Sequence, residues 1–168
     1  MHNITLTPLA FSATEIAQVV NLYGSNPEYG HSSGDYDPAD VKAEQVEADL
    51  RGDVRNGIEV LLATDDHDGL VGMVGLLSRH PVDGFPWIGL LMVHGSLQRS
   101  GLGRAMTVTV ERLLLDRGER AVRLAVLEKN SSAEAFWRSL GWVEIDRRPD
   151  RAHGRPCIVM HKTLQANQ

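Results

Sequence analysis

The chain is poor in cysteine. Cys157 is the single cysteine among 168 residues, so an intramolecular disulfide is excluded. No histidine pairs with it in the sequence, and we expect a buried strand residue rather than a nucleophile. The acidic run Asp65–Asp68 has no matching ligands elsewhere, so the sequence predicts no metal site.

Long apolar runs are also missing. The longest lies near Trp87 to Val93 and falls well short of the roughly 18 residues that a membrane-spanning helix needs. Residues 1–10 do not show a charged segment followed by an apolar signal core. We therefore expect no membrane partner and a cytoplasmic location.

Neither sign of charge dominates. The chain has 17 Lys and Arg against 22 Asp and Glu, a formal net charge of -5, and the two signs are mixed along it. Because no basic stripe could neutralise a phosphate backbone, a nucleic-acid partner is not expected. With 42% hydrophobic residues the composition is that of a globular protein, and the length predicts a single domain over 1–168.

What the chain does contain is a mixed order of helices and strands. Ser12 and Glu15 form a capping box that predicts a helix over 13–23, and Asp37 followed by Pro38 predicts a second helix starting at 38. Further helices are expected over 102–117 and 131–140, and strands over 4–10, 58–64, 70–78, 86–93, 121–127, 142–148 and 157–164. This order predicts a mixed α/β fold. The apolar run 86–93 predicts a central strand covered on both faces.

The segment Gln98–Arg104 places two glycines where a strand gives way to a helix. A helix N-terminus carries unpaired N–H groups and a partial positive charge, and glycine lets a ligand approach the backbone. The segment lacks the Gly-Lys-Ser/Thr ending of a P-loop and the third glycine of a dinucleotide fingerprint. It predicts a phosphate-binding turn, with an ordinary tight turn as the alternative.

Two patterns at this spacing resemble the GCN5-related N-acetyltransferase (GNAT) superfamily along nearly the whole chain. Gln98, Gly101 and Gly103 match its Gln/Arg-x-x-Gly-x-Gly/Ala motif. The family pattern Asn-x-x-Ala-x-x-Phe-Tyr-x-x-x-Gly-Phe is followed by Asn130, Ala133, Phe136, Trp137, Gly141 and Trp142. The resemblance implies a mixed, mostly antiparallel sheet flanked by about four helices, with a V-shaped splay between the strand over 86–93 and the next strand.

The resemblance also implies acetyl-CoA as co-substrate. Its pyrophosphate would bind the backbone N–H groups of 99–104, and its pantetheine arm would run along 91–93 and form a hydrogen bond with Asn130. The implied binding residues are Leu91, Met92, Val93, Gln98, Arg99, Ser100, Gly101, Leu102, Gly103, Arg104, Asn130, Ala133, Phe136 and Trp137. Homodimers are frequent for this fold.

The implied reaction is direct attack of a primary amine, from a small molecule or a peptide, on the thioester in a ternary complex. The N–H of Val93 would polarise the carbonyl. Trp137 stands where many relatives have a tyrosine, and an indole is no proton donor for the thiolate at neutral pH. Either the thiolate leaves without a side-chain acid or another residue protonates it, for which Tyr29 is the candidate. The candidate bases are Glu28, His31 and His94.

His80 and Asp83 are further candidates at the border of the acceptor pocket. The missing tyrosine keeps open an alternative of another class, a catalytically silent module that binds acyl-CoA. The sequence does not name the acceptor amine.

Overall fold

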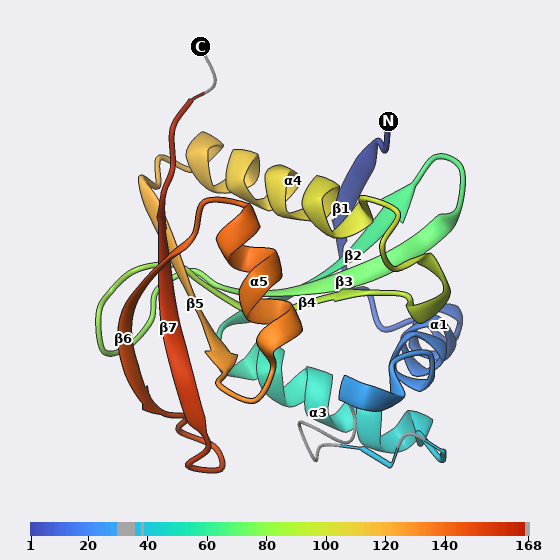
Figure 1. The fold of residues 1–168 in the computed structure, drawn as a ribbon. Coiled ribbons are helices and arrows are strands. Elements are labelled where there is room, and N and C mark those ends of the chain that lie inside the picture. Colours follow the sequence, from blue (N-terminus) through green and yellow to red (C-terminus); the bar gives the residue numbers. More distant parts are fainter. Residues whose placement is uncertain (30–35, 38, 167–168) are drawn as a thin grey trace. The chain divides into compact units, whose positions relative to one another are not determined.

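Seven strands form one sheet in the hydrogen-bonded order β1-β2-β3-β4-β5-β7-β6 (Figure 1). The computed structural model describes residues 1–29, 36–37 and 39–166. Pairing is antiparallel between β1 and β2, between β5 and β7, and between β6 and β7, and it is parallel between β4 and β5. The predicted mixed, mostly antiparallel sheet is therefore confirmed.

The strands are β1 (Ile4–Pro8), β2 (Ile58–Asp65), β3 (Gly69–Leu77), β4 (Trp87–Val93), β5 (Ala121–Leu127), β6 (Val143–Pro149) and β7 (Pro156–Thr163). The α-helices with described bounds are α1 (Ala13–Gly24), α3 (Ala43–Arg55), α4 (Leu102–Asp116) and α5 (Ser131–Ser139). A short 3-10 turn, η1 (Gly95–Leu97), follows β4. Apart from the start of α3, the expected elements agree with these bounds to within a few residues.

Contacts divide the chain into two compact units. Unit 1 comprises 1–76 and 90–109, and unit 2 comprises 77–89 and 110–168. The elements β3, β4 and α4 each pass from one unit into the other. The single domain expected from the length stays a prediction.

Helix α1 begins at the predicted capping box. The Ser12 hydroxyl accepts a hydrogen bond from the Glu15 N–H at 3.1 Å, and the Glu15 carboxylate accepts the Ser12 N–H at 3.1 Å. The helix buries Val19 and Leu22 in the core of unit 1. It contacts α3, which packs against β2 (Figure 1).

The predicted start of the second helix is wrong. Helix α3 begins at Ala43, five residues later than expected, and Lys42 supplies no side-chain cap. Asp37 is used in a local turn instead, since its carboxylate accepts the Ala39 N–H at 2.9 Å and its carbonyl accepts the Asp40 N–H at 3.0 Å. Pro38 lies outside the described residues.

Strand β4 is less covered than its apolar sequence suggested. Trp87, Ile88 and Met92 are buried, but Gly89 is exposed and Val93 is only half-buried. The prediction of a strand covered on both faces is therefore wrong for part of its length. An apolar run shows that a strand avoids charge, and it does not show what covers the strand.

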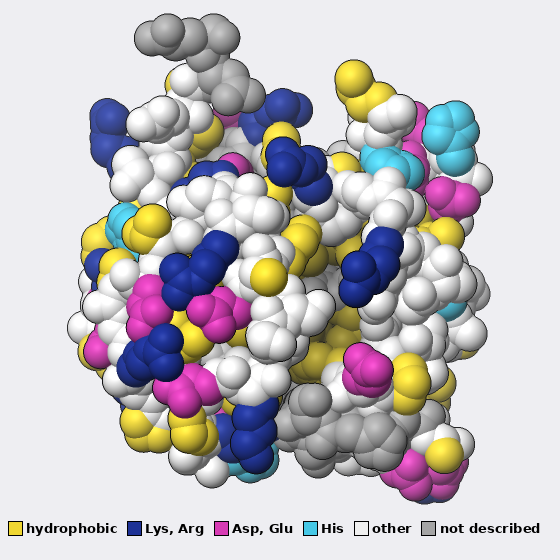
Figure 2. Space-filling model, in the orientation of Figure 1, with side chains coloured by type: hydrophobic (Ala, Val, Ile, Leu, Met, Phe, Trp, Pro, Cys, Tyr) yellow, Lys and Arg dark blue, Asp and Glu magenta, His cyan; other side chains and the backbone are white. Residues whose placement is uncertain are grey.

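The surface of unit 2 carries charges of both signs. Arg138 pairs with Glu134 and with Glu144, each at 2.9 Å, and Arg147 pairs with Glu144. Figure 2 shows basic and acidic side chains side by side over α5 and β6. Exposed pairs of this kind add little stability, and they leave no single-sign field there. Within the described ranges, no helix is long and apolar enough to cross a membrane.

Candidate functional site

The segment 98–104, called the glycine segment below, leads from η1 into α4. Its backbone takes left-handed values at Arg99 (φ 60°) and Gly101 (φ 91°). Helix α4 begins at Leu102, so the N–H groups of its first turn have no acceptor within the helix. The first N–H beyond that turn, of Ala105, binds the Gly101 carbonyl at 3.0 Å. The turn therefore presents unpaired donors at the positive end of a helix, which suits an anion.

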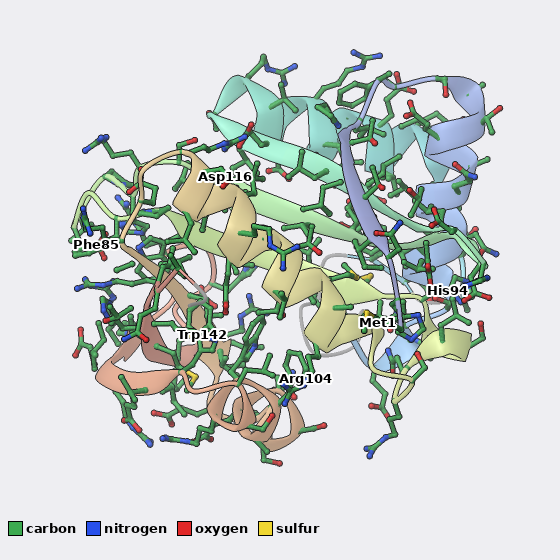
Figure 3. All side chains as sticks on the ribbon, turned by 90° about the horizontal axis from the view of Figure 1, so that it is seen from above. Met1, Phe85, His94, Arg104, Asp116 and Trp142 are labelled. Atoms are coloured by element: carbon green, nitrogen blue, oxygen red, sulfur yellow. The ribbon has the colours of Figure 1, made fainter. Side chains whose placement is uncertain are left out.

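The side chains of the glycine segment divide into buried and exposed groups. Leu102 is 1% exposed and belongs to the core, so it can serve a ligand only through its backbone. Arg99 and Arg104 are exposed, and Arg104 stands on the first turn of α4, with Asp116 at the far end of that helix (Figure 3). Guanidinium groups placed here can pair with phosphate oxygens.

Gln98, the first residue of the motif, is exposed, but its amide group contacts the protein. Its amide donates to Asn26 Oδ1, and Asn26 is 8% exposed. The Asn26 amide donates in turn to the Val93 carbonyl at 3.1 Å and to the Leu22 carbonyl at 3.0 Å. One buried asparagine thus ties the end of α1 to the end of β4 and to the glycine segment. We call this set the Asn26 latch.

The Asn26 latch could not be predicted from the sequence. Asn26 follows the end of α1, a place where asparagine is common for local reasons. Its partner Val93 lies 67 residues away, and no short-range pattern relates the two positions.

Replacing Asn26 with aspartate should make the protein less stable. In the variant a carboxylate faces the carbonyls of Leu22 and Val93, where an amide now donates. We expect the free energy of unfolding to fall by about 2–4 kcal/mol, measured by urea denaturation. The control is Asn56→Asp, the same change at an exposed residue beyond α3, which should cost less than about 0.5 kcal/mol. Equal losses in both variants would refute the latch.

At the end of β4 the backbone N–H and C=O groups point alternately toward β3 and away from it. The His94 N–H donates to the Val71 carbonyl of β3 at 2.8 Å. Backbone groups alternate along a strand, so the N–H groups of Leu91 and Val93 point away from β3. The Val93 carbonyl agrees with this, because it accepts from Asn26 and not from β3. Among the described residues, the ladder between β4 and β5 consists of the pair Trp87 and Arg123.

His94 has both ring nitrogens engaged. Nδ1 accepts the Ser96 N–H at 3.3 Å and caps η1, while Nε2 lies 2.8 Å from Asn21 Oδ1, which can only accept. These partners assign the neutral Nε2–H tautomer. A general base needs a free nitrogen, and in this arrangement His94 has none.

Of the candidate catalytic residues that follow α1, the structure describes Glu28 and Tyr29. Glu28 is exposed, and Tyr29 is half-buried with its ring 6.2 Å from that of Tyr23, against the core of unit 1. His31 lies outside the described residues. The proton-transfer roles of these residues stay predictions.

The second motif lies on α5, in unit 2, and not with the glycine segment in unit 1. Asn130 caps the helix, since its side-chain oxygen accepts the Ala133 N–H at 3.0 Å. Trp137 is 8% exposed and packs between Phe136 and Trp142, at centroid distances of 4.9 and 5.2 Å. This burial gives Trp137 the place of a core anchor in unit 2.

His80 and Asp83 belong to a cluster within unit 2, near Phe85 (Figure 3). The Asp83 carboxylate accepts hydrogen bonds from the Arg123 guanidinium at 3.0 Å and from the Trp87 indole N–H at 3.1 Å. His80 stacks on Trp87 with ring centroids 4.3 Å apart. Because Asp83 is neutralised by Arg123, these residues have the contacts of a structural cluster.

This cluster should make the protein less stable in acid. Burial, together with nearby arginines, lowers the pKa of His80. His161 on β7 accepts a hydrogen bond from Arg123 at 3.2 Å, and burial and the charge of Arg123 lower its pKa. Unfolded histidines bind protons near their usual pKa of about 6.5, while the folded ones stay neutral to lower pH. The stabilisation by the neutral histidines is complete above the unfolded pKa of about 6.5, and it is lost as the pH falls through the lower pKa values of the folded protein.

We expect the melting temperature to drop by roughly a few degrees between about pH 7 and about pH 5, and less in the His80→Gln/His161→Gln variant. A melting temperature with the same pH dependence in wild type and variant would contradict this origin.

The fold and the glycine segment together define a class of protein: one with a mixed sheet in which a helix start suited to an anion follows a central strand after one short turn. A family model described as an Acetyltransferase (GNAT) domain matches residues 33–164. The chain therefore belongs to the GNAT acetyltransferase family. No curated protein matches it.

Solved structures agree in fold. An acetyltransferase from Thermus thermophilus has a TM-score of 0.75 at 22% identity, covering 98% of this chain and 100% of that one. Spermidine N-acetyltransferase from Vibrio cholerae, in complex with CoA and spermine, has a TM-score of 0.73 at 16% identity, covering 96% and 95%. The ribosomal-protein-S18-alanine N-acetyltransferase from Escherichia coli has a TM-score of 0.65 at 17% identity, covering 99% and 97%.

Proposed function

We propose that this protein transfers the acetyl group of acetyl-CoA to a primary amine, by direct attack in a ternary complex. The observation that carries the proposal is the glycine segment, whose unpaired N–H groups and exposed Arg99 and Arg104 follow the short turn η1 after β4. Family membership supports CoA among phosphate-bearing ligands. In the described ranges no group of three or more His, Cys, Asp or Glu is placed to hold a metal ion.

The residues present fit two parts of CoA, the pyrophosphate and the pantetheine arm. The glycine segment offers backbone N–H groups to the pyrophosphate, and Gly101 has no side chain to block the approach. Leu91 and Val93 offer N–H groups on the edge of β4 that faces away from β3, which suits the amides of a pantetheine arm. Asn130, Ala133, Phe136 and Trp137 are assigned to the same arm by resemblance.

When bound, acetyl-CoA supplies an activated thioester carbonyl. The N–H of Val93 would stabilise the oxyanion that forms as the amine attacks. Glu28 or His31 would take the proton of the attacking amine, directly or through water. Trp137 donates no proton to the thiolate, so the thiolate leaves without a side-chain acid or receives a proton from Tyr29.

The acceptor is proposed at the level of its class, a primary amine on a small molecule or a peptide. Solved relatives are named for spermidine, for an aminoglycoside and for the alanine of a ribosomal protein, so one fold serves all of these. A homodimer and a cytoplasmic location are part of the proposal.

A second candidate rests on Trp137. With a buried indole in place of the usual tyrosine, the chain could bind acyl-CoA without turning it over. The two functions differ in whether acetyl-CoA releases free thiol in the presence of an amine.

The test combines binding with turnover. We expect CoA and acetyl-CoA to raise the melting temperature, ATP and NAD to leave it unchanged, and an amine panel to include at least one amine that releases thiol from acetyl-CoA. Stabilisation by CoA without thiol release from any amine would favour the binding module. Stabilisation by ATP or NAD and none by CoA would refute both functions.

Tyr29→Phe tests the acid. If the Tyr29 hydroxyl protonates the thiolate, we expect kcat to fall by about tenfold or more, with an unchanged dissociation constant for CoA. The matched control is Tyr36→Phe, which removes a hydroxyl that donates to Asp49 at 2.9 Å and should leave kcat unaltered. Equal turnover of wild type and Tyr29→Phe would exclude Tyr29 from the reaction.

A further inference from the structure

His2 joins a buried carboxylate to the glycine segment. Its Nδ1 lies 2.7 Å from Oδ2 of Asp65, and its Nε2 lies 2.9 Å from the carbonyl oxygen of Ser100. The Asp65 side chain is fully buried at the end of β2, whereas that of His2 is 27% exposed. All these residues belong to unit 1. The contact spans 98 residues of sequence, so no local motif predicts it.

The partners of His2 determine where its protons lie. The Ser100 carbonyl can only accept, so Nε2 carries a proton. The Asp65 carboxylate also accepts the Asn3 N–H at 3.3 Å, as an ionised group would, so Nδ1 carries a proton too. The imidazole is thus a cation in this arrangement. In agreement, the hydrogen bond to Asp65, and then the one to Ser100, raises the pKa of His2.

The contact with Ser100 also orients the next N–H. In a trans peptide the C=O and the N–H point in opposite directions. Holding the Ser100 carbonyl toward His2 therefore directs the Gly101 N–H to the other side of the peptide. Gly101, at φ 91°, is a residue at which a rotated peptide would otherwise cost little.

We infer that His2 is a positioning residue for the phosphate of the donor substrate. Held by Asp65, it fixes the Ser100–Gly101 peptide with its carbonyl away from the ligand and its N–H toward it, and it places a positive charge behind the glycine segment. This inference rests on the proposed function, because it takes the pyrophosphate of CoA as the anion.

A dependence on pH follows from the same contacts. The charged groups that act on His2 are Asp65 at the end of β2 and the amino group of Met1, while the glycine segment presents the Ser100 carbonyl. When His2 is deprotonated, it keeps the Nδ1 proton that it shares with Asp65 and loses the Nε2 proton. The Nε2 lone pair then faces the Ser100 carbonyl oxygen. The contact breaks, so CoA should bind more weakly as the pH rises through the raised pKa of His2.

The experiment measures the dissociation constant of CoA by calorimetry between about pH 6 and about pH 9. It uses the full chain without an N-terminal tag. Wild type should lose roughly five- to tenfold in affinity over this range beyond any loss seen in His2→Gln, which keeps a donor but no charge. His2→Gln should bind CoA weakly at the lower pH, with a smaller dependence on pH. The control His67→Gln, in the exposed turn after β2, should behave as wild type.

Rescue separates positioning from simple stability. His2→Arg keeps a charged donor at every pH, so it should restore CoA affinity at about pH 9 to the level wild type shows at about pH 6. Melting temperatures of all variants identify any loss of fold. Equal affinities of wild type and His2→Gln at every pH would overturn the inference and leave the proposed function standing. Absence of CoA binding by wild type at every pH would refute the proposed function itself.

Discussion

Gly103→Asp is expected to abolish CoA binding without weakening the fold. The substitution places a carboxylate in the first turn of α4, where the pyrophosphate would lie. Like charges about 4 Å apart near a protein surface repel by up to about 4 kcal/mol, so affinity should fall at least about a hundredfold. An acidic residue in the first turn of a helix is otherwise favourable, so the melting temperature should stay the same or rise. Calorimetry with CoA and a thermal melt measure the two effects.

The matched control is Gly103→Ala. Alanine adds bulk without charge, is allowed by the Gly/Ala position of the motif, and favours the helix over glycine. It should keep CoA affinity within about threefold of wild type. Full CoA affinity in the Gly103→Asp variant would place the phosphate site elsewhere.

Val93→Pro is expected to stop turnover while leaving the strand in place. Proline removes the N–H of Val93, which points away from β3, and it leaves the bond from the His94 N–H to the Val71 carbonyl, 2.8 Å long, intact. Loss of one oxyanion donor should lower kcat by roughly a hundredfold or more. Steady-state kinetics with acetyl-CoA and a responsive amine measure it.

Val93→Ala is the control for the loss of the Val93 side chain. It keeps the N–H and removes two methyl groups from a half-buried position. This variant should retain kcat within a few-fold of wild type. If Val93→Pro and Val93→Ala turn over equally well, the oxyanion is stabilised by another group. Near-ultraviolet circular dichroism of both variants shows whether the fold is kept.

Most elements of the fold could be predicted because their signals are local. The capping box of Ser12 and Glu15 and the glycines after β4 act within a few residues of the structures they determine. The start of α3 could not be predicted in this way. Asp37 suits a helix cap and a local turn equally well, and the turn is formed.

The exposed backbone donors of the candidate site could be predicted because they depend on local backbone geometry. The glycine segment carries its own chemistry, since a helix start needs no distant residue to expose N–H groups. Its support could not be predicted, because Asn26 reaches Val93 and His2 reaches Ser100 across long stretches of sequence. Contact of Gln98 with the ligand stays a prediction, and in the structure its amide donates to Asn26. The motif therefore includes a residue that holds the loop as well as residues that offer N–H groups.

The site proposed for the phosphates of CoA is tested by a crystal structure with bound CoA. We expect pyrophosphate oxygens about 3 Å from backbone nitrogens of the first turn of α4 and of Gly101, with the Ser100 carbonyl still directed to His2. Ordered CoA whose pyrophosphate lies away from the glycine segment would contradict the proposed site.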